Sequence, residues 1–153
     1  MLGRLTKRQI DEVLRASTVG RIGVSVDDKT YVVPITYVYD GDSAYGHTTL
    51  GLKVRMMRRN PEVCFEVDDI ADMANWRSVI AQGRYEELSG DVAVAAAKLI
   101  AARLGPLTTS QTAGPSGRAR GGKTQVSYRI RLGERTGRFE RKAGKTRTRG
   151  RHG

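Results

Sequence analysis

The residues best suited to bind a phosphate group lie between positions 31 and 59. A β-rich run from Tyr31 to Tyr39 leads through the turn Asp40-Gly41-Asp42 into a short strand, Ser43 to His47. The hydroxyl-rich segment Thr48-Thr49-Leu50-Gly51 follows, and then a helical stretch with the cations Lys53, Arg55, Arg58 and Arg59. Loop amides and hydroxyls, a helix N-terminus and a cation together neutralise a phosphate. The spacing therefore predicts a phosphate cradle.

His47 is the candidate catalytic residue, because it ends the strand that enters this cradle. A histidine can hold or release a proton near neutral pH, so it could orient a substrate or supply a proton. The alternative is a polar side chain satisfied by a neighbour. Lys53 lies nearest the helix start, so we expect it to contact the phosphate. Arg58 and Arg59 are expected to lie on the solvated face of the helix.

Three other features of the sequence are weaker candidates for a functional site: a nucleotide-loop motif, an acidic cluster and a lone cysteine. Gly117 to Thr124 matches the pattern G-x-x-x-x-G-K-[ST], but a nucleotide-binding loop needs a buried strand before it and a helix after it. A loop and an alternating strand stand there instead, so we expect no nucleotide hydrolysis. Asp68, Asp69 and Asp72 lack a spaced ligand set, so we expect a solvated loop and no metal. Cys64 is the only cysteine, which excludes an internal disulfide.

The net charge of +11 arises at the C-terminal end of the chain. Residues 1–117 contain 14 basic and 14 acidic residues, whereas residues 118–153 contain 13 basic residues against Glu134 and Glu140. We expect residues 141–153 to form a disordered basic tail. Such a tail could contact nucleic acid nonspecifically, or serve solubility or an acidic partner.

The hydrophobic pattern predicts a mainly β domain over residues 1–140. Helices are expected from Thr6 to Ser17, where Thr6 and Gln9 fit a capping box, and from Asp91 to Leu104. Alternating and β-branched residues predict strands at 20–26, 31–39, 43–47, 63–69, 76–88 and 126–132. Gly83 is expected to mark a bulge or bend in the strand at 76–88. Short strands joined by hairpins favour an antiparallel barrel. No apolar run approaches transmembrane length, and we expect a cytoplasmic protein without membrane contact.

The segments GRIGVSVDDKTYVVPITYVYDGDSAYGHTTLGLKVRMMRRNPEVCFEVDD, WRSVIAQGRYEEL and RIRLGERTGRFE, in this order, resemble a known group. They resemble the FMN-binding split-barrel proteins of the pyridoxamine 5'-phosphate oxidase-like group, nearest to the nitroimidazole-resistance (Nim) branch. This resemblance covers roughly Leu5 to Glu140. It implies an antiparallel split β-barrel with a few flanking helices, a homodimer, and FMN held between the subunits.

The resemblance also implies roles for individual residues. The backbone of Val33, Pro34, Ile35 and Thr36 would face the flavin ring, and His47 would lie close to it. The phosphate would be held by Thr48, Thr49, Lys53 and Arg55. The cleft would be completed, in part from the partner subunit, by Trp76, Arg77, Ser78 and Val79.

The resemblance implies a flavin-dependent oxidoreductase with a small-molecule electron acceptor, such as a nitroreductase. One departure is Leu52, which stands where many relatives have an arginine before the lysine. Deazaflavin and haem are therefore kept as alternative cofactors. The alternative functions are a noncatalytic flavin- or haem-binding protein, and a nucleic-acid-associated protein that acts through its basic tail.

Overall fold

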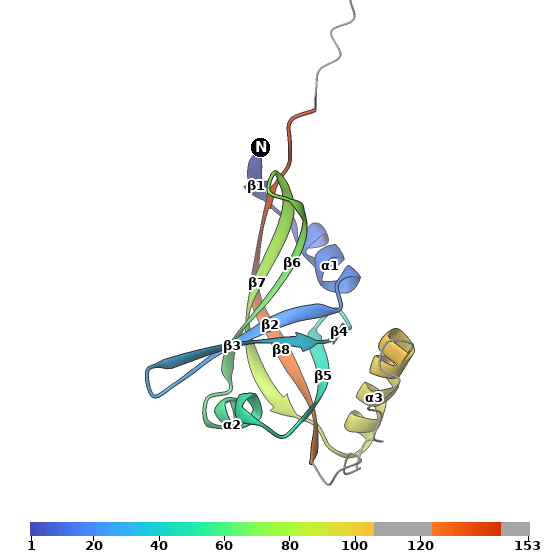
Figure 1. Ribbon diagram of the computed structural model, residues 1–153. Helices are drawn as coiled ribbons and strands as arrows, with labels where there is room; N and C mark the ends of the chain where they lie inside the picture. Colours follow the sequence, from blue (N-terminus) through green and yellow to red (C-terminus); the bar gives the residue numbers. More distant parts are fainter. Residues whose placement is uncertain (106–123, 145–153) are drawn as a thin grey trace, which may run out of the picture.

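The computed structural model describes residues 1–105 and 124–144 (Figure 1). The motif match at 117–124 lies almost entirely outside the described residues, and so do the loop expected before it and most of the predicted tail. Among the described residues, no helix is long and apolar enough to cross a membrane.

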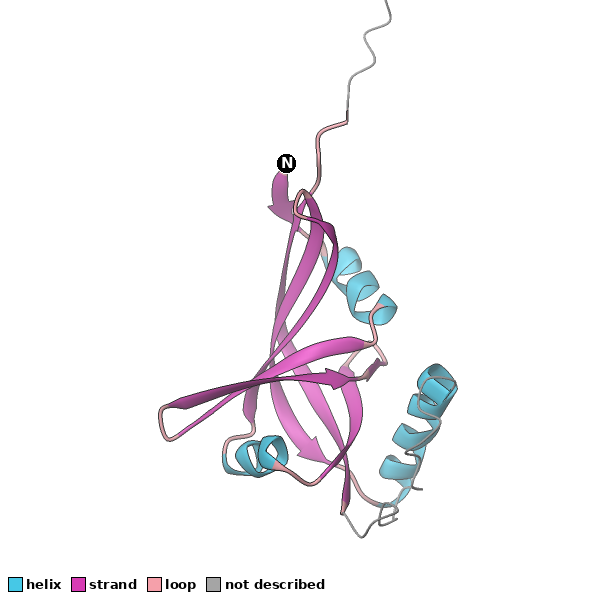
Figure 2. Ribbon diagram, in the orientation of Figure 1, coloured by secondary structure: helices cyan, strands magenta, loops and turns pink. Residues whose placement is uncertain are grey.

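One antiparallel sheet of eight strands forms the body of the molecule (Figure 2). The strands are β1 (Leu2–Arg4), β2 (Val19–Val26), β3 (Lys29–Thr36), β4 (Val38–Tyr39), β5 (Ser43–Thr49), β6 (Glu62–Asp72), β7 (Asn75–Glu87) and β8 (Gln125–Glu140). Their order is β3-β2-β6-β7-β8-β5-β4, and β1 pairs with the far end of β8. The predicted mainly β, antiparallel split-barrel fold with flanking helices is confirmed.

Tyr37 connects the two strands that stand at opposite ends of the strand order. The strands at the two ends of the sheet order, β3 and β4, are consecutive in the chain and are separated by this residue alone. Its backbone N–H donates to the carbonyl of Thr18 (2.9 Å), and its ring is fully buried. The prediction of one strand from Tyr31 to Tyr39 is therefore wrong at Tyr37, because the chain changes strand partners there.

The core lies inside the curved sheet, where alternate side chains of the strands meet. Phe65 on β6 packs edge-on against Tyr37, with ring centroids 5.0 Å apart. Gly83 lies at a register shift between β7 and β8, as predicted. A Cβ atom on this glycine would lie 2.5 Å from Ile130 Cγ2, so a side chain there would displace the core. The absence of a side chain at Gly83 therefore lets β7 and β8 lie close together.

Three helices of the described part of the chain flank the sheet (Figure 1). They are α1 (Lys7–Ala16), α2 (Leu52–Arg59) and α3 (Gly90–Leu104). The predicted capping box of α1 is present, since Thr6 Oγ1 accepts from Gln9 N (3.2 Å) and Gln9 Oε1 accepts from Thr6 N (2.9 Å). Ser89 is the N-cap residue of α3, a position that serine favours, but its side chain forms no capping hydrogen bond.

Strand β6 is longer than predicted and extends to Asp72. Its charged final residues are compatible with a strand because they pair across the sheet or close the turn. Asp69 Oδ2 accepts from Arg77 Nη2 at 2.8 Å, and Asp72 Oδ1 accepts from the backbone of Ala74 at 2.8 Å. The hairpin of β6 and β7 therefore projects well beyond the core (Figure 1).

Candidate functional site

A cavity of about 540 Å³ lies between β3, β5, the start of α2, and α3. We call it the β5–α2 cavity. It is lined by Pro34, Ile35, Thr36, Gly46, His47, Thr48, Thr49, Leu50, Gly51, Lys53, Ile100, Leu104, Gln125 and Tyr128. Its volume lies in the range of sites for small organic ligands. The structure thus brings seven of the predicted site residues into one cavity: Pro34, Ile35, Thr36, His47, Thr48, Thr49 and Lys53.

The N-terminus of α2 opens at one side of this cavity. Gly51 is the N-cap residue and carries no side chain to cap the helix, so the first backbone N–H groups of α2 keep their capacity to donate. No acidic residue stands in the first turn to offset the positive end of the helix. This arrangement suits an anion.

Lys53 supplies the only charged group among the described residues that line the cavity. Its side chain is half-buried, and burial lowers the pKa of its ammonium group below the usual value. No described residue forms an ion pair or a hydrogen bond with that group. A half-buried cation without a partner is costly unless a ligand supplies the counter-charge.

The two threonines stand at the end of β5, next to the helix start. The Thr49 hydroxyl accepts a hydrogen bond from Gln125 Nε2 at 3.1 Å, which leaves its own proton available for a ligand. The Thr48 hydroxyl donates to the carbonyl of Thr49 at 3.3 Å. Pairing of β5 with β8 fixes both residues, because Thr49 lies opposite Gln125 in the register.

His47 lies on β5 opposite Ser127 of β8. Burial alone lowers the pKa of its imidazole, and no carboxylate offsets the effect. The imidazole is therefore neutral at neutral pH, with one nitrogen able to donate and the other able to accept a hydrogen bond. No hydrogen bond to another described residue occupies it.

The other walls of the cavity are largely apolar. Pro34 and Ile35 come from β3, while Ile100 and Leu104 come from α3. Tyr128 is almost completely buried at the base, and a Cβ atom on Gly46 would collide with its ring and hydroxyl. The cavity therefore combines an anion-binding end with apolar walls. This donor set fits a flat organic molecule that carries a phosphate.

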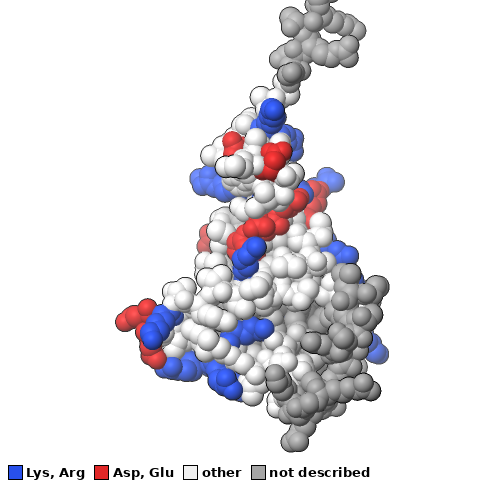
Figure 3. Space-filling view, in the orientation of Figure 1, with Lys and Arg blue, Asp and Glu red and all other residues white. Residues whose placement is uncertain are grey.

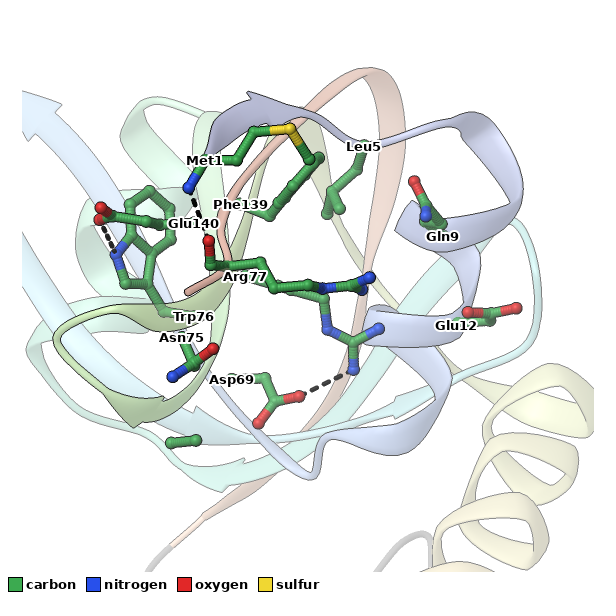
Figure 4. Close-up of a pocket in the computed structure, with 12 residues that line it drawn as sticks. Met1, Leu5, Gln9, Glu12, Asp69, Asn75, Trp76, Arg77, Phe139 and Glu140 are labelled. Carbon is green, nitrogen blue, oxygen red and sulfur yellow. Dashed lines mark hydrogen bonds and ion pairs between the residues drawn. The ribbon is translucent and has the colours of Figure 1, made fainter. Parts of the chain in front are cut away.

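Trp76 and Arg77 lie in a different cavity, at the projecting end of β6 and β7 (Figure 4). This second cavity of about 360 Å³ shares no lining residue with the first. Arg77 Nη2 donates to Asp69 at 2.8 Å, and the Trp76 indole N–H donates to Glu140 at 3.2 Å. Within one chain, these two residues do not complete the β5–α2 cavity.

The remaining predicted site residues also lie away from the cavity lining. Val33 packs against the core, Val79 is buried in it, and Ser78 and Arg55 line neither cavity. Arg58 and Arg59 form exposed ion pairs, Arg58 with Glu87 at 2.5 Å and Arg59 with Asp27 at 2.9 Å. Their predicted surface roles are confirmed. Figure 3 shows such mixed charges along the surface.

The lining residues that the sequence did not single out come mainly from α3 and β8. They include Ile100, Leu104, Gln125 and Tyr128. Gln125 and Tyr128 belong to the predicted last strand, but the residues alone do not reveal that β8 pairs with β5. The helix α3 is apolar on nearly all sides, so its sequence does not identify the side that meets a ligand.

Comparison with protein families gives a match along most of the chain. The model of a family described as Pyridoxamine 5'-phosphate oxidase matches residues 6–139. An uncharacterized protein of Rhizobium meliloti (strain 1021) is 34% identical over 84 residues, which are 55% of this chain. The chain spans 56% of the length of that curated relative.

Solved structures share the fold. The crystal structure of a FAD-binding protein from Mesorhizobium loti is 29% identical, with a TM-score of 0.74, and the match covers 91% of this chain and 98% of that one. A candidate 5-nitroimidazole antibiotic resistance protein from Bacteroides thetaiotaomicron is 18% identical (TM-score 0.69, covering 91% and 87%). A FAD and haem binding protein from Mycobacterium smegmatis is 13% identical (TM-score 0.70, covering 91% and 73%). The last two show similarity of fold alone.

Proposed function

We propose that this chain, which belongs to the pyridoxamine 5'-phosphate oxidase family, binds a flavin in the β5–α2 cavity and acts as a flavin-dependent oxidoreductase. The observation that carries the proposal is the half-buried Lys53 without a partner among the described residues, beside the uncapped N-terminus of α2. A phosphate would supply the missing counter-charge.

The roles of the residues follow from their places in the cavity. Lys53, Thr49 and the first amides of α2 would hold the phosphate, and the apolar walls would exclude water from the ring. A bound flavin supplies the transfer of electrons or hydride, while the protein positions it. His47, neutral and half-buried, would orient the substrate or hold a proton at one of its ring nitrogens.

FMN and a small-molecule electron acceptor are the molecules that we propose for this cavity. The related Mesorhizobium loti protein is described as FAD-binding, which supports a flavin, and we propose FMN as the form bound here. A small molecule would accept the electrons, and nitro compounds are the first class to test. Haem and deazaflavin are the alternative cofactors, and each has an absorbance spectrum that differs from that of a flavin.

We also propose that two copies of the chain form the complete site. Trp76 and Arg77 do not line the β5–α2 cavity of their own chain; they line a second cavity that shares no residue with it. Near them, Ile70 and Met73 expose 64% and 93% of their surfaces. A second subunit would cover these apolar side chains and bring Trp76 to the partner's cavity.

The test is an absorbance spectrum of the purified protein, repeated after addition of FMN and desalting. Lys53→Met should weaken flavin binding roughly 10- to 100-fold, because a hydrogen bond to a charged group is worth about 1.5–3 kcal/mol. The same substitution should leave the unfolding midpoint in urea unchanged or raise it, since a half-buried ammonium group is removed. The flavin released from the protein is identified by chromatography against FMN and FAD.

Lys29→Met is the matched control. Lys29 is an exposed lysine at the start of β3 and lines neither cavity. This variant should retain flavin as the unmodified protein does. Complete release of added FMN and FAD by the unmodified protein would contradict the proposal, and a Soret band would favour haem.

A further inference from the structure

We propose that the edge of β8 near α1 binds the phosphodiester backbone of a nucleic acid. A groove of about 340 Å³ lies there, and we call it the β8-edge groove. Its lining contains four cations and no carboxylate: Arg4, Lys7, Arg135 and Arg138, together with Leu5, Ile10, Thr136 and Gly137. This site is separate from the proposed flavin site, because the two share no residue.

The groove exists because the neighbours of β8 change along its length. β5 pairs with β8 as far as Arg131, and β1 pairs with it from Arg138 onward. Between these two ladders the edge of β8 has no strand beside it among the described residues. Gly137 lets β1 and α1 approach closely at this point, since a Cβ atom there would lie 2.8 Å from Leu5 Cβ. The groove therefore lies where β8, β1 and the start of α1 meet.

The cations in this groove form no ion pair with a described carboxylate. Arg4 and Arg138 lie directly opposite each other in the β1–β8 register, and like charges at such positions repel. Neither of them, nor Lys7, forms an ion pair with another described residue. Arg135 donates to the Tyr39 hydroxyl and to the carbonyls of Gly133 and Leu132. The pKa of Asp11 on α1 is lowered first by Arg15 and also by the charge of Arg135, although Arg135 and Asp11 form no ion pair. The groove thus brings together three cations without a described ion-pair partner, Arg4, Lys7 and Arg138, and a fourth, Arg135, that is only partly compensated by Asp11.

Helix α1 adds to the positive potential. Lys7 is its first residue, and its first turn contains no acidic residue. The carboxylates further along the helix are already paired, Asp11 with Arg15 at 2.8 Å and Glu12 with Arg8 at 3.4 Å. The positive end of the helix dipole and the four cationic side chains therefore both raise the positive potential at the groove.

The amino-acid sequence that follows β8 favours an extended polyanion over a single phosphate. β8 ends at Glu140, two residues after Arg138 of the groove. The sequence that follows, residues 141–153, contains six lysines and arginines and no acidic residue. Positive charge that continues along the chain from a positive groove matches the repeated charges of a nucleic-acid backbone. The lining offers no aromatic side chain to stack on a base, so the binding is independent of sequence.

The experiment measures binding of a fluorescein-labelled mixed-sequence DNA duplex to the full chain by fluorescence anisotropy at increasing salt. The double variant Lys7→Gln/Arg138→Gln should bind the duplex more weakly. The magnitude of its slope of log K against log salt should fall by about two, since each phosphate contact contributes about one. The control is Lys29→Gln/Lys98→Gln, which removes the same charge from two exposed lysines outside the groove. The control should keep the slope, and both variants should keep flavin.

Several results would overturn the proposal. Equal slopes for the two double variants would mean that net charge or the C-terminal segment alone binds the DNA. Competition by phosphate beyond that of chloride at equal ionic strength would indicate a site for a free phosphate. Binding to vesicles of phosphatidylcholine and phosphatidylglycerol without binding to the duplex would indicate a membrane surface instead.

Discussion

At the scale of single residues, the half-buried His47 gives the protein a pH-dependent stability. Burial lowers the pKa of the folded imidazole below its usual 6.5, so the unfolded chain takes up a proton first as the pH falls. The contribution of His47 to stability is therefore fully present above about pH 6.5 and is lost as the pH falls through the folded pKa.

His47→Gln should flatten this dependence. Urea unfolding at neutral and at mildly acidic pH should show a smaller loss of unfolding free energy for the variant than for the unmodified protein. Glu66 has a raised pKa, because of burial and then of the neighbouring Asp68, and therefore also changes stability in this range. Its effect is common to both proteins and cancels in the comparison. Equal losses in the two proteins would show that His47 is not the buried neutral base.

At the scale of elements, the tyrosine that joins β3 to β4 also holds the end of α1. The Tyr37 hydroxyl donates to the carbonyl of Leu14 at 2.7 Å, and both residues are fully buried. That carbonyl belongs to the last turn of α1, where the helix itself provides no donor. Tyr37→Phe should lower the unfolding free energy by about 1–3 kcal/mol, the cost of a buried polar group left unpaired.

Chemical denaturation of Tyr37→Phe and Tyr31→Phe measures this effect. Tyr31 is only partly buried, and its hydroxyl bonds to no described residue. Its substitution should therefore change the unfolding free energy by no more than about 0.5 kcal/mol. If the two variants lose equal stability, the hydrogen bond to Leu14 contributes nothing beyond the ring.

At the scale of the whole molecule, the proposed dimer predicts that two defective chains can restore one site. Lys53→Ala and Trp76→Ala should each bind little flavin as homodimers. A mixed dimer isolated with two different tags should contain one site with both native residues and bind about half as much flavin as the unmodified dimer. Light scattering during chromatography establishes the dimer itself. Mixed dimers without flavin would place Trp76 outside the site.

Local signals in the sequence predicted several elements of the fold and the place of Lys53 in the β5–α2 cavity. The capping box of Thr6 and Gln9 located α1, and the position of Lys53 just inside α2 placed it in the cavity. These features depend on neighbouring residues in the chain. The bulge at Gly83 was predictable for the same reason, since a glycine within a strand pattern marks such a site.

Features that depend on distant parts of the chain were not predictable in this way. The break at Tyr37 arises because β3 pairs with β2 and β4 pairs with β5, which no local pattern specifies. The separation of Trp76 from His47 depends on the length of the β6–β7 hairpin beyond the core. Ile100 and Leu104 face the cavity because of how α3 packs, although the helix is apolar on several sides.

The central place of β8 has a consequence for synthesis of the protein. β8 follows the other seven strands of the described sheet in the chain, and it pairs with β7, β5 and β1. Before it leaves the ribosome, those three strands lack a neighbour and expose edges that favour aggregation. The complete eight-stranded sheet therefore cannot form until residues 125–140 have been synthesised and are free to pair with all three strands.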